Sequence, residues 1–139
     1  MSLEVLNIKG LDLKNNKVIN LNLELFESDE EDVVSISIYY DNKEIKKKGE
    51  YWFLVFQELK DLLLDKYIGL QCYGSLINVY PSPMMMNMGG HKAYFLKIGE
   101  PSLNKDIVNI FDYIDIYEFA TKEQQDQFYN KWLNSIMNK

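Results

Sequence analysis

The residues best suited to chemistry gather in the segment 81–91. It contains the only histidine of the chain and most of its methionines, at Met84, Met85, Met86, Met88 and His91. Thioether and imidazole groups, joined by a thiolate from Cys72, are the donors that Cu(I) prefers. No defined ligand spacing accompanies them, so we expect no metal site and no cofactor. We interpret the methionines as gap-filling side chains or as an adaptable contact surface.

Cys72 and His91 are also the one pair that could act as a nucleophile and its general base. No motif of a known nucleophilic enzyme surrounds either residue. Cys72 lies at an apolar position of a strand-like segment, where a buried structural thiol is the usual outcome. We therefore expect no catalytic residues.

The same segment could instead form a lid over a ligand pocket. The loop and pocket residues of this hypothesis are Met84, Met86, Met88, His91 and Tyr94. Gly89-Gly90 does not form a phosphate-binding loop, because such loops need further glycines or a Gly-Lys-Ser/Thr ending at the start of a helix. The segment that follows Gly90 has the pattern of a strand instead.

The stretch from Glu24 to Asp32 contains six carboxylates and no lysine. They are Glu24, Glu27, Asp29, Glu30, Glu31 and Asp32. The spaced Asp/Asn residues, central glycine and distal glutamate of a calcium loop are missing. Such a run is most often a solvated turn. Its alternative role is to attract a basic protein partner, and these six residues are the partner-binding surface of that hypothesis.

The composition narrows the class of ligand. The chain has 139 residues, a net charge of −6, and 15 cations that are all lysine. Without the guanidinium fork of arginine, an acidic chain has little attraction for phosphate or for base edges, so we expect no nucleic-acid partner. The N-terminus lacks the pattern of a signal peptide, and no apolar run reaches the ~18 residues of a membrane span. The single cysteine allows no internal disulfide, and we expect a cytoplasmic protein that does not contact membranes.

Alternating apolar and polar residues predict strands, because successive side chains of a strand point to opposite faces. The predicted strands are 3–9, 18–26, 34–40 and 93–98. Asn15-Asn16 lies between two such segments as a turn signal, and Asp41-Asn42-Lys43 is a second turn signal after the strand 34–40. The segment 68–80 alternates too, but its phase changes at Gly74-Ser75, which predicts a bulge or a tight turn.

Two segments have the periodicity of helices. Residues 50–67 repeat apolar side chains three and four positions apart, which predicts the central core helix. Thr121 and Gln124 form a capping box that predicts the start of a C-terminal helix. The segment 103–119 fits either a short helix or an irregular apolar stretch. The order of elements predicts one α+β domain over residues 1–139, with a mostly antiparallel sheet packed on a central amphipathic helix.

Three short segments carry a resemblance to known proteins. They are Gln-Cys-Tyr-Gly at 71–74, Asn-Val-Tyr-Pro-Ser-Pro-Met at 78–84 and Gly-Gly-His-Lys-Ala-Tyr at 89–94. They resemble small uncharacterised proteins of low-GC Gram-positive bacteria, and the size and acidity of the chain are similar to those of immunity proteins of polymorphic-toxin systems. The resemblance implies a cytosolic inhibitor that binds a toxin domain, often a basic nuclease. It implies no site residues.

Three functions follow as competing hypotheses. The first is a non-enzymatic binding protein, of the immunity type, that meets a basic partner at the acidic stretch. The second is a small-molecule-binding or enzymatic domain with the 81–91 loop over a pocket. The third is a homodimeric structural or phage-derived module, whose oligomeric state the sequence leaves open.

Overall fold

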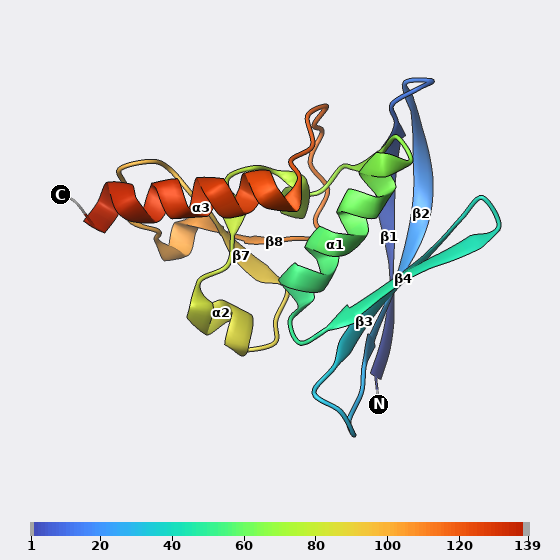
Figure 1. Ribbon diagram of the computed structural model, residues 1–139, viewed down its shortest axis with the longest axis horizontal. Helices are drawn as coiled ribbons and strands as arrows, with labels where there is room; N and C mark the ends of the chain where they lie inside the picture. The colour runs from blue at the N-terminus through green and yellow to red at the C-terminus, as the bar shows by residue number, and fades with distance from the viewer. Residues whose placement is uncertain (1, 138–139) are drawn as a thin grey trace.

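The computed structural model describes residues 2–137, and its larger sheet is antiparallel with the strand order β4-β3-β2-β1-β5 (Figure 1). The five strands of this first sheet are β1 (Ser2–Asp12), β2 (Lys17–Glu27), β3 (Val34–Tyr40), β4 (Lys43–Gly49) and β5 (Ile68–Leu70). The α+β class expected from the sequence is confirmed. The strand β1 is longer than the predicted range 3–9. It pairs with β2 along its whole length, at polar and glycine positions as well as at apolar ones.

Asparagine and aspartate close both hairpins of the first sheet. Asn16 has a φ of 55° between β1 and β2, and Asp41 and Asn42 have φ values of 53° and 62° between β3 and β4. These left-handed conformations favour residues with short polar side chains, which tolerate them better than β-branched or bulky residues do. Both predicted turns are therefore confirmed.

The helix α1 (Trp52–Asp65) covers one face of the first sheet, as predicted for the central helix (Figure 1). Alternate residues of each strand point toward α1, and we call this side of the sheet the inner face. Leu23, Ile36 and Ile38 are fully buried there. Phe56 and Leu59 of α1 are equally buried. The alternation of β2 and β3 therefore decides which of their side chains face α1 and which face away.

The chain leaves the first sheet after β5, at the place where the predicted strand 68–80 changes phase. Of the two expected conformations, a bulge or a tight turn, the structure has the turn: a 3₁₀ turn, η1 (Tyr73–Ser75), in which Gly74 N–H donates to the carbonyl of Ile110 over 2.8 Å. A Cβ on Gly74 would lie 2.7 Å from the ring of Phe56, so only glycine allows this close approach without a shift. The segment is thus split between two sheets.

The second sheet has the order β6-β7-β8 and is also antiparallel. Its strands are β6 (Val79–Tyr80), β7 (Lys92–Phe95) and β8 (Ile107–Asn109). A short helix, α2 (Pro83–Asn87), lies within the segment expected to be an irregular loop, and Ser82 caps it by accepting from Met85 N–H over 3.1 Å. The undecided segment 103–119 begins with the 3₁₀ turn η2 (Asn104–Asp106), continues as β8 and is irregular beyond it.

The C-terminal helix α3 (Lys122–Met137) begins at the predicted capping box. Thr121 N–H donates to Gln124 Oε1 over 2.9 Å, and Gln124 N–H donates to Thr121 Oγ1 over 3.2 Å. A buried lysine of α1 fixes the start of this helix, because the Lys60 ammonium donates to the carbonyl of Ala120 over 2.6 Å. In the part of the chain that the structure describes, no helix combines the length and the apolar character needed to cross a membrane.

Candidate functional site

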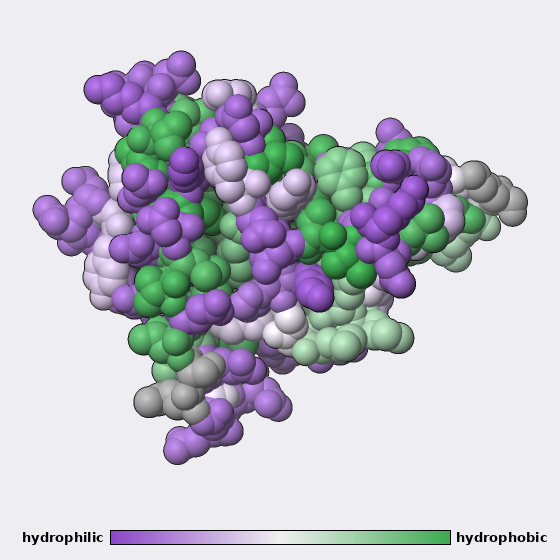
Figure 2. Space-filling model, turned by 180° about the vertical axis from the view of Figure 1, so that it is seen from behind, coloured by the Kyte–Doolittle hydropathy of each residue, from purple (hydrophilic) through white to green (hydrophobic). Residues whose placement is uncertain are grey.

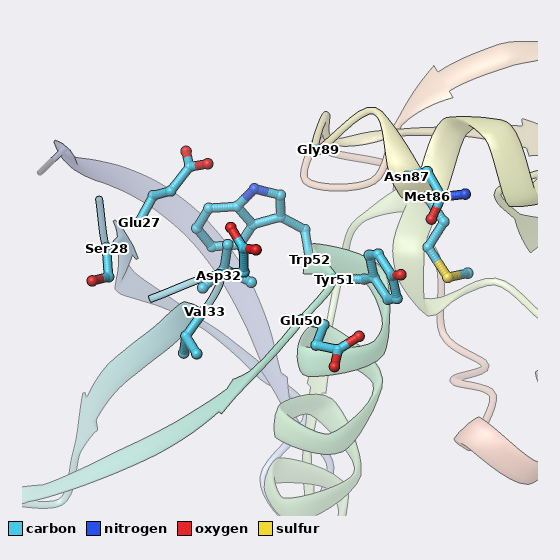
Figure 3. A pocket seen from close by; sticks show the side chains of 11 residues that line it. Glu27, Ser28, Asp32, Val33, Glu50, Tyr51, Trp52, Met86, Asn87 and Gly89 are labelled. Carbon is cyan, nitrogen blue, oxygen red and sulfur yellow. The ribbon is translucent and has the colours of Figure 1, made fainter. Parts of the chain in front are cut away.

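A groove of about 450 Å³ lies where three segments distant in sequence meet at one end of the first sheet (Figure 3). The end of β2 and the following turn form one side, the residues at the start of α1 form the middle, and the end of α2 forms the other side. The lining residues are Glu27, Ser28, Asp32, Val33, Val34, Glu50, Tyr51, Trp52, Met86, Asn87 and Gly89. The groove therefore joins the acidic stretch to the methionine segment, which the sequence analysis treated as separate features.

Strand alternation divides the acidic stretch between two faces of the sheet. Glu27 shares the inner side of β2 with the buried Leu25 and lines the groove. Glu24 has the opposite parity and points away from α1. Asp32 returns to the groove after the turn, whereas Asp29, Glu30 and Glu31 do not line it. The six carboxylates thus form no single patch.

Carboxylates dominate the charge of the groove. Glu27, Asp32 and Glu50 lie among its lining residues, and none of the described lining residues is basic. Figure 3 shows the Trp52 indole extending from the start of α1 toward the side of Glu27 and Asp32. The carboxylates suit an ammonium or guanidinium group, which they attract by charge. Tyr51 supplies aromatic area beside them, whereas Trp52 is only 5% exposed.

His91 contacts Trp52 but does not line the groove. Its ring makes edge contacts with Trp52 and with Phe111, each with a centroid distance of 5.1 Å. Burial lowers the pKa of His91 below its ordinary value, while the nearby carboxylates of Glu4 and Glu27 act in the opposite direction. The imidazole lies between the two rings and packs against Trp52, and this arrangement gives His91 a packing role.

The methionines of the 81–91 segment lie on the outside of the molecule or against the core. The side chains of Met84 and Met88 are 72% and 76% exposed, whereas Met86 packs against the core and reaches the groove. Figure 2 shows a pale green apolar patch over the α2 segment. This surface adjoins the acidic groove and supplies apolar contact area next to it.

Cys72 lies in an environment that suppresses thiol chemistry. Its side chain is fully buried, its sulfur lies 3.7 Å from Ser75 Oγ, and burial raises the pKa of the thiol to about 12. A thiol with so high a pKa is a poor nucleophile near neutral pH. Within residues 2–137, no cluster of three or more His, Cys, Asp or Glu side chains has a metal-binding arrangement.

Tyr94 belongs to a different cavity. It lines a pocket of about 180 Å³ between the second sheet and α3, together with Tyr80, Tyr129 and Trp132. The rings of Tyr80 and Tyr129 stack with a centroid distance of 4.4 Å. From the 81–91 segment, Ser82 and Pro83 reach this pocket, whereas Met86 lines the acidic groove. Of the residues of the lid hypothesis, Met86 lines the acidic groove and Tyr94 lines this pocket, whereas Met84, Met88 and His91 line neither.

The sequence analysis missed the contribution of the segment before α1. Glu50, Tyr51 and Trp52 form the middle of the groove, where an acid and two aromatic residues precede a core helix. That juxtaposition of charge and aromatic rings is a signal in the sequence itself. Comparison of the chain with family models and with curated proteins gave no match.

Proposed function

We propose that this protein is a non-enzymatic binding protein of the immunity type that captures a basic protein partner in the acidic groove. The observation that carries the proposal is the convergence of Glu27, Asp32 and Glu50 on one groove with an aromatic wall. The resemblance of the chain to small proteins of low-GC Gram-positive bacteria is in keeping with a bacterial, cytoplasmic inhibitor.

The chemistry of the groove favours a protein partner that presents lysine or arginine. Three carboxylates line the groove, and each of them attracts a cation that enters it. The exposed methionines Met84 and Met88 beside the groove provide adaptable apolar area for the surface around the cation. Arginine is the usual cationic anchor of interfaces, and this chain has none, so here the partner supplies the cation.

The experiment compares two variants of equal charge as baits in the native host. The groove variant carries Glu27→Gln, Asp32→Asn and Glu50→Gln. The control variant carries Asp112→Asn, Glu118→Gln and Glu123→Gln, three exposed acids that do not line the groove. We expect the wild-type chain and the control to recover the same basic protein and to inhibit its activity, and the groove variant to lose both.

Equal loss of the partner in both variants would show that net charge alone directs binding and would contradict the groove as the site. Recovery of the same partner by the groove variant would contradict it as well. The affinity of the wild-type chain for the isolated partner should fall as salt increases, since exposed charges are screened over ~10 Å at 0.1 M ionic strength.

The pocket between α3 and the second sheet supports a second candidate function, the binding of a small aromatic molecule. Its lining is rich in aromatic residues, and Tyr80, Tyr129 and Trp132 give it flat ring surfaces. Ligand-observed NMR with indole and p-cresol as probes tests this function. We expect saturation transfer to either probe from the wild-type chain and none from Tyr129→Ala; equal signals from both proteins would contradict it.

A further inference from the structure

The outer face of the first sheet, which points away from α1, is covered by the chain itself at one end. The ring of Phe119 lies where a Cβ on Gly69 would stand, and the ammonium of Lys9 lies 5.1 Å from the centroid of the Tyr113 ring. Leu11 is buried there although it points outward. The irregular segment after β8 thus covers the outer face where β5 pairs with β1.

At the opposite end of the outer face, where β1 begins, the apolar residues of β1 are exposed. Val5 and Leu3 of β1 point outward and are 56% and 63% exposed, next to the partly buried Phe26 of β2. Val5 and Leu3 therefore leave apolar area in water that neither α1 nor the segment after β8 covers. An exposed apolar sheet face of this kind is typical of a contact surface.

The strand register arranges the open part in two rows that cross four strands. One row runs Val5, Glu24, Ser37, Lys46, and the next runs Leu3, Phe26, Ser35, Lys48. Each row has a bulky apolar residue on β1, a small serine on β3 and a lysine on β4, and the two serines, Ser35 and Ser37, are only 5% and 7% exposed among these longer neighbours. The face is thus apolar along one edge and cationic along the other, with Glu24 on the strand beside the apolar edge.

We propose that this open face is the interface of a homodimer, in which a second copy of this chain stacks its own outer face upon it. A two-fold axis between the sheets and parallel to the strands places β1 over β4 of the second copy and β2 over its β3. Each row then meets itself in reverse order, which is the self-complementary arrangement that a closed dimer requires. Sheets stack in this way about 10 Å apart, aligned within about 30°.

Charge and size complementarity select the second copy as the occupant. In this arrangement Lys46 of the second copy extends its aliphatic stem over Val5 and brings its ammonium beside Glu24, and the same contact repeats across the axis. Phe26 lies over the Ser35 position of the second copy, where the buried serine leaves the sheet surface low between its longer neighbours. The dimer leaves the acidic groove free, because Glu27 lies on the inner side of β2 and Glu24 on the outer side.

Sedimentation equilibrium over a range of protein concentrations tests the dimer. We expect the wild-type chain to reach twice its mass of 16.4 kDa. Glu24→Lys should weaken dimerisation by about tenfold or more, since each dimer contains two such contacts. Combining Glu24→Lys with Lys46→Glu should restore the dimer, because the exchange reverses both charges and keeps the pairing.

Two valines of similar exposure distinguish loss of the dimer interface from a general effect of adding a surface lysine. Val5→Lys should give a monomer, whereas Val18→Lys should remain a dimer, although Val18 is 53% exposed on the same face beyond the two rows. Circular dichroism of each variant confirms that the fold is intact. A wild-type chain that stays monomeric at every concentration, or charge variants that dimerise as the wild type does, would overturn the proposal.

Discussion

Gln57 of α1 and Gln125 of α3 meet side chain to side chain in the interior, with Gln57 Nε2 3.0 Å from Gln125 Oε1 and neither residue exposed. Gln125 Nε2 also donates to the carbonyls of Gly74 and Leu76, each over 2.8 Å. One side chain thereby joins both long helices to the turn where the chain passes from the first sheet to the second. Gln57 Oε1 has no hydrogen-bond partner within the described chain.

This asymmetry predicts unequal costs for the two glutamines. Gln125→Leu removes the donor to the buried carbonyl of Gly74 and one of the two donors to the part-buried carbonyl of Leu76, so we expect a loss of about 2–3 kcal/mol in the free energy of unfolding. Gln57→Leu takes the donor from Gln125 Oε1 but also removes the unpaired Gln57 Oε1, so it should cost about 1 kcal/mol. Urea denaturation of both variants provides the measurement. Equal losses would show that the bonds from Gln125 to the Gly74 and Leu76 carbonyls add no stability beyond the bond between the two glutamines.

The capping box at the start of α3 predicts a local effect on stability. Thr121→Ala removes the acceptor for Gln124 N–H and should cost about 1 kcal/mol. Thr121→Ser keeps a hydroxyl in place and should lie within a few tenths of a kcal/mol of the wild type. Thermal unfolding of the two variants checks this; a serine variant as unstable as the alanine variant would assign the effect to the lost methyl group.

Cys72 predicts a loss of stability in alkaline solution. Its pKa is about 12 in the folded chain against an ordinary value of 9.0, so its contribution is full below pH 9 and disappears as the pH rises toward 12. At about pH 10 the ionised thiol favours the unfolded chain by about 1.4 kcal/mol. Urea midpoints at pH 8 and pH 10 should therefore fall more for the wild type than for Cys72→Ala. Parallel losses in the two proteins would exclude the thiol as the cause.

His91 reports on the charge of the groove because it is the only histidine. Burial lowers its pKa in the folded chain, so the unfolded chain binds its proton more tightly and stability decreases as the pH falls through the range below 6.5. Glu27→Gln removes a charge that opposes this effect and should lower the pKa of His91 further. An NMR titration of the imidazole protons measures the shift, with the remote Glu118→Gln as a control that should leave it unchanged.

Gly69 predicts how the segment after β8 is held on the sheet. A Cβ at this position would overlap the ring of Phe119, so Gly69→Ala should expel the ring and cost about 1–3 kcal/mol. It should also expose residues 113–119 to proteases. Adding Phe119→Ala removes the overlap, and the double variant should then lose no more stability than Phe119→Ala alone. Additive losses would mean that Gly69 is needed for the conformation of β5 and not to make room for the Phe119 ring.

Local patterns in the sequence were enough to predict the elements whose stability is local. The alternation over 34–40 predicted β3, and the capping residues Thr121 and Gln124 predicted the start of α3. The segments 68–80 and 103–119 were harder, because Gly74 of the first is hydrogen-bonded to Ile110 of the second and packs closely against Phe56 of α1. No window of neighbouring residues contains that information.

The sequence by itself determined the α+β class, the absence of arginine, and the acidity of the stretch from Glu24 to Asp32. Only the tertiary structure decided that Glu27 and Asp32 join Glu50 and Trp52 in one groove while Glu24 faces the opposite side of the sheet. The physical reason is that composition fixes which charges exist, whereas strand parity and the packing of α1 against the sheet fix which of them share a surface.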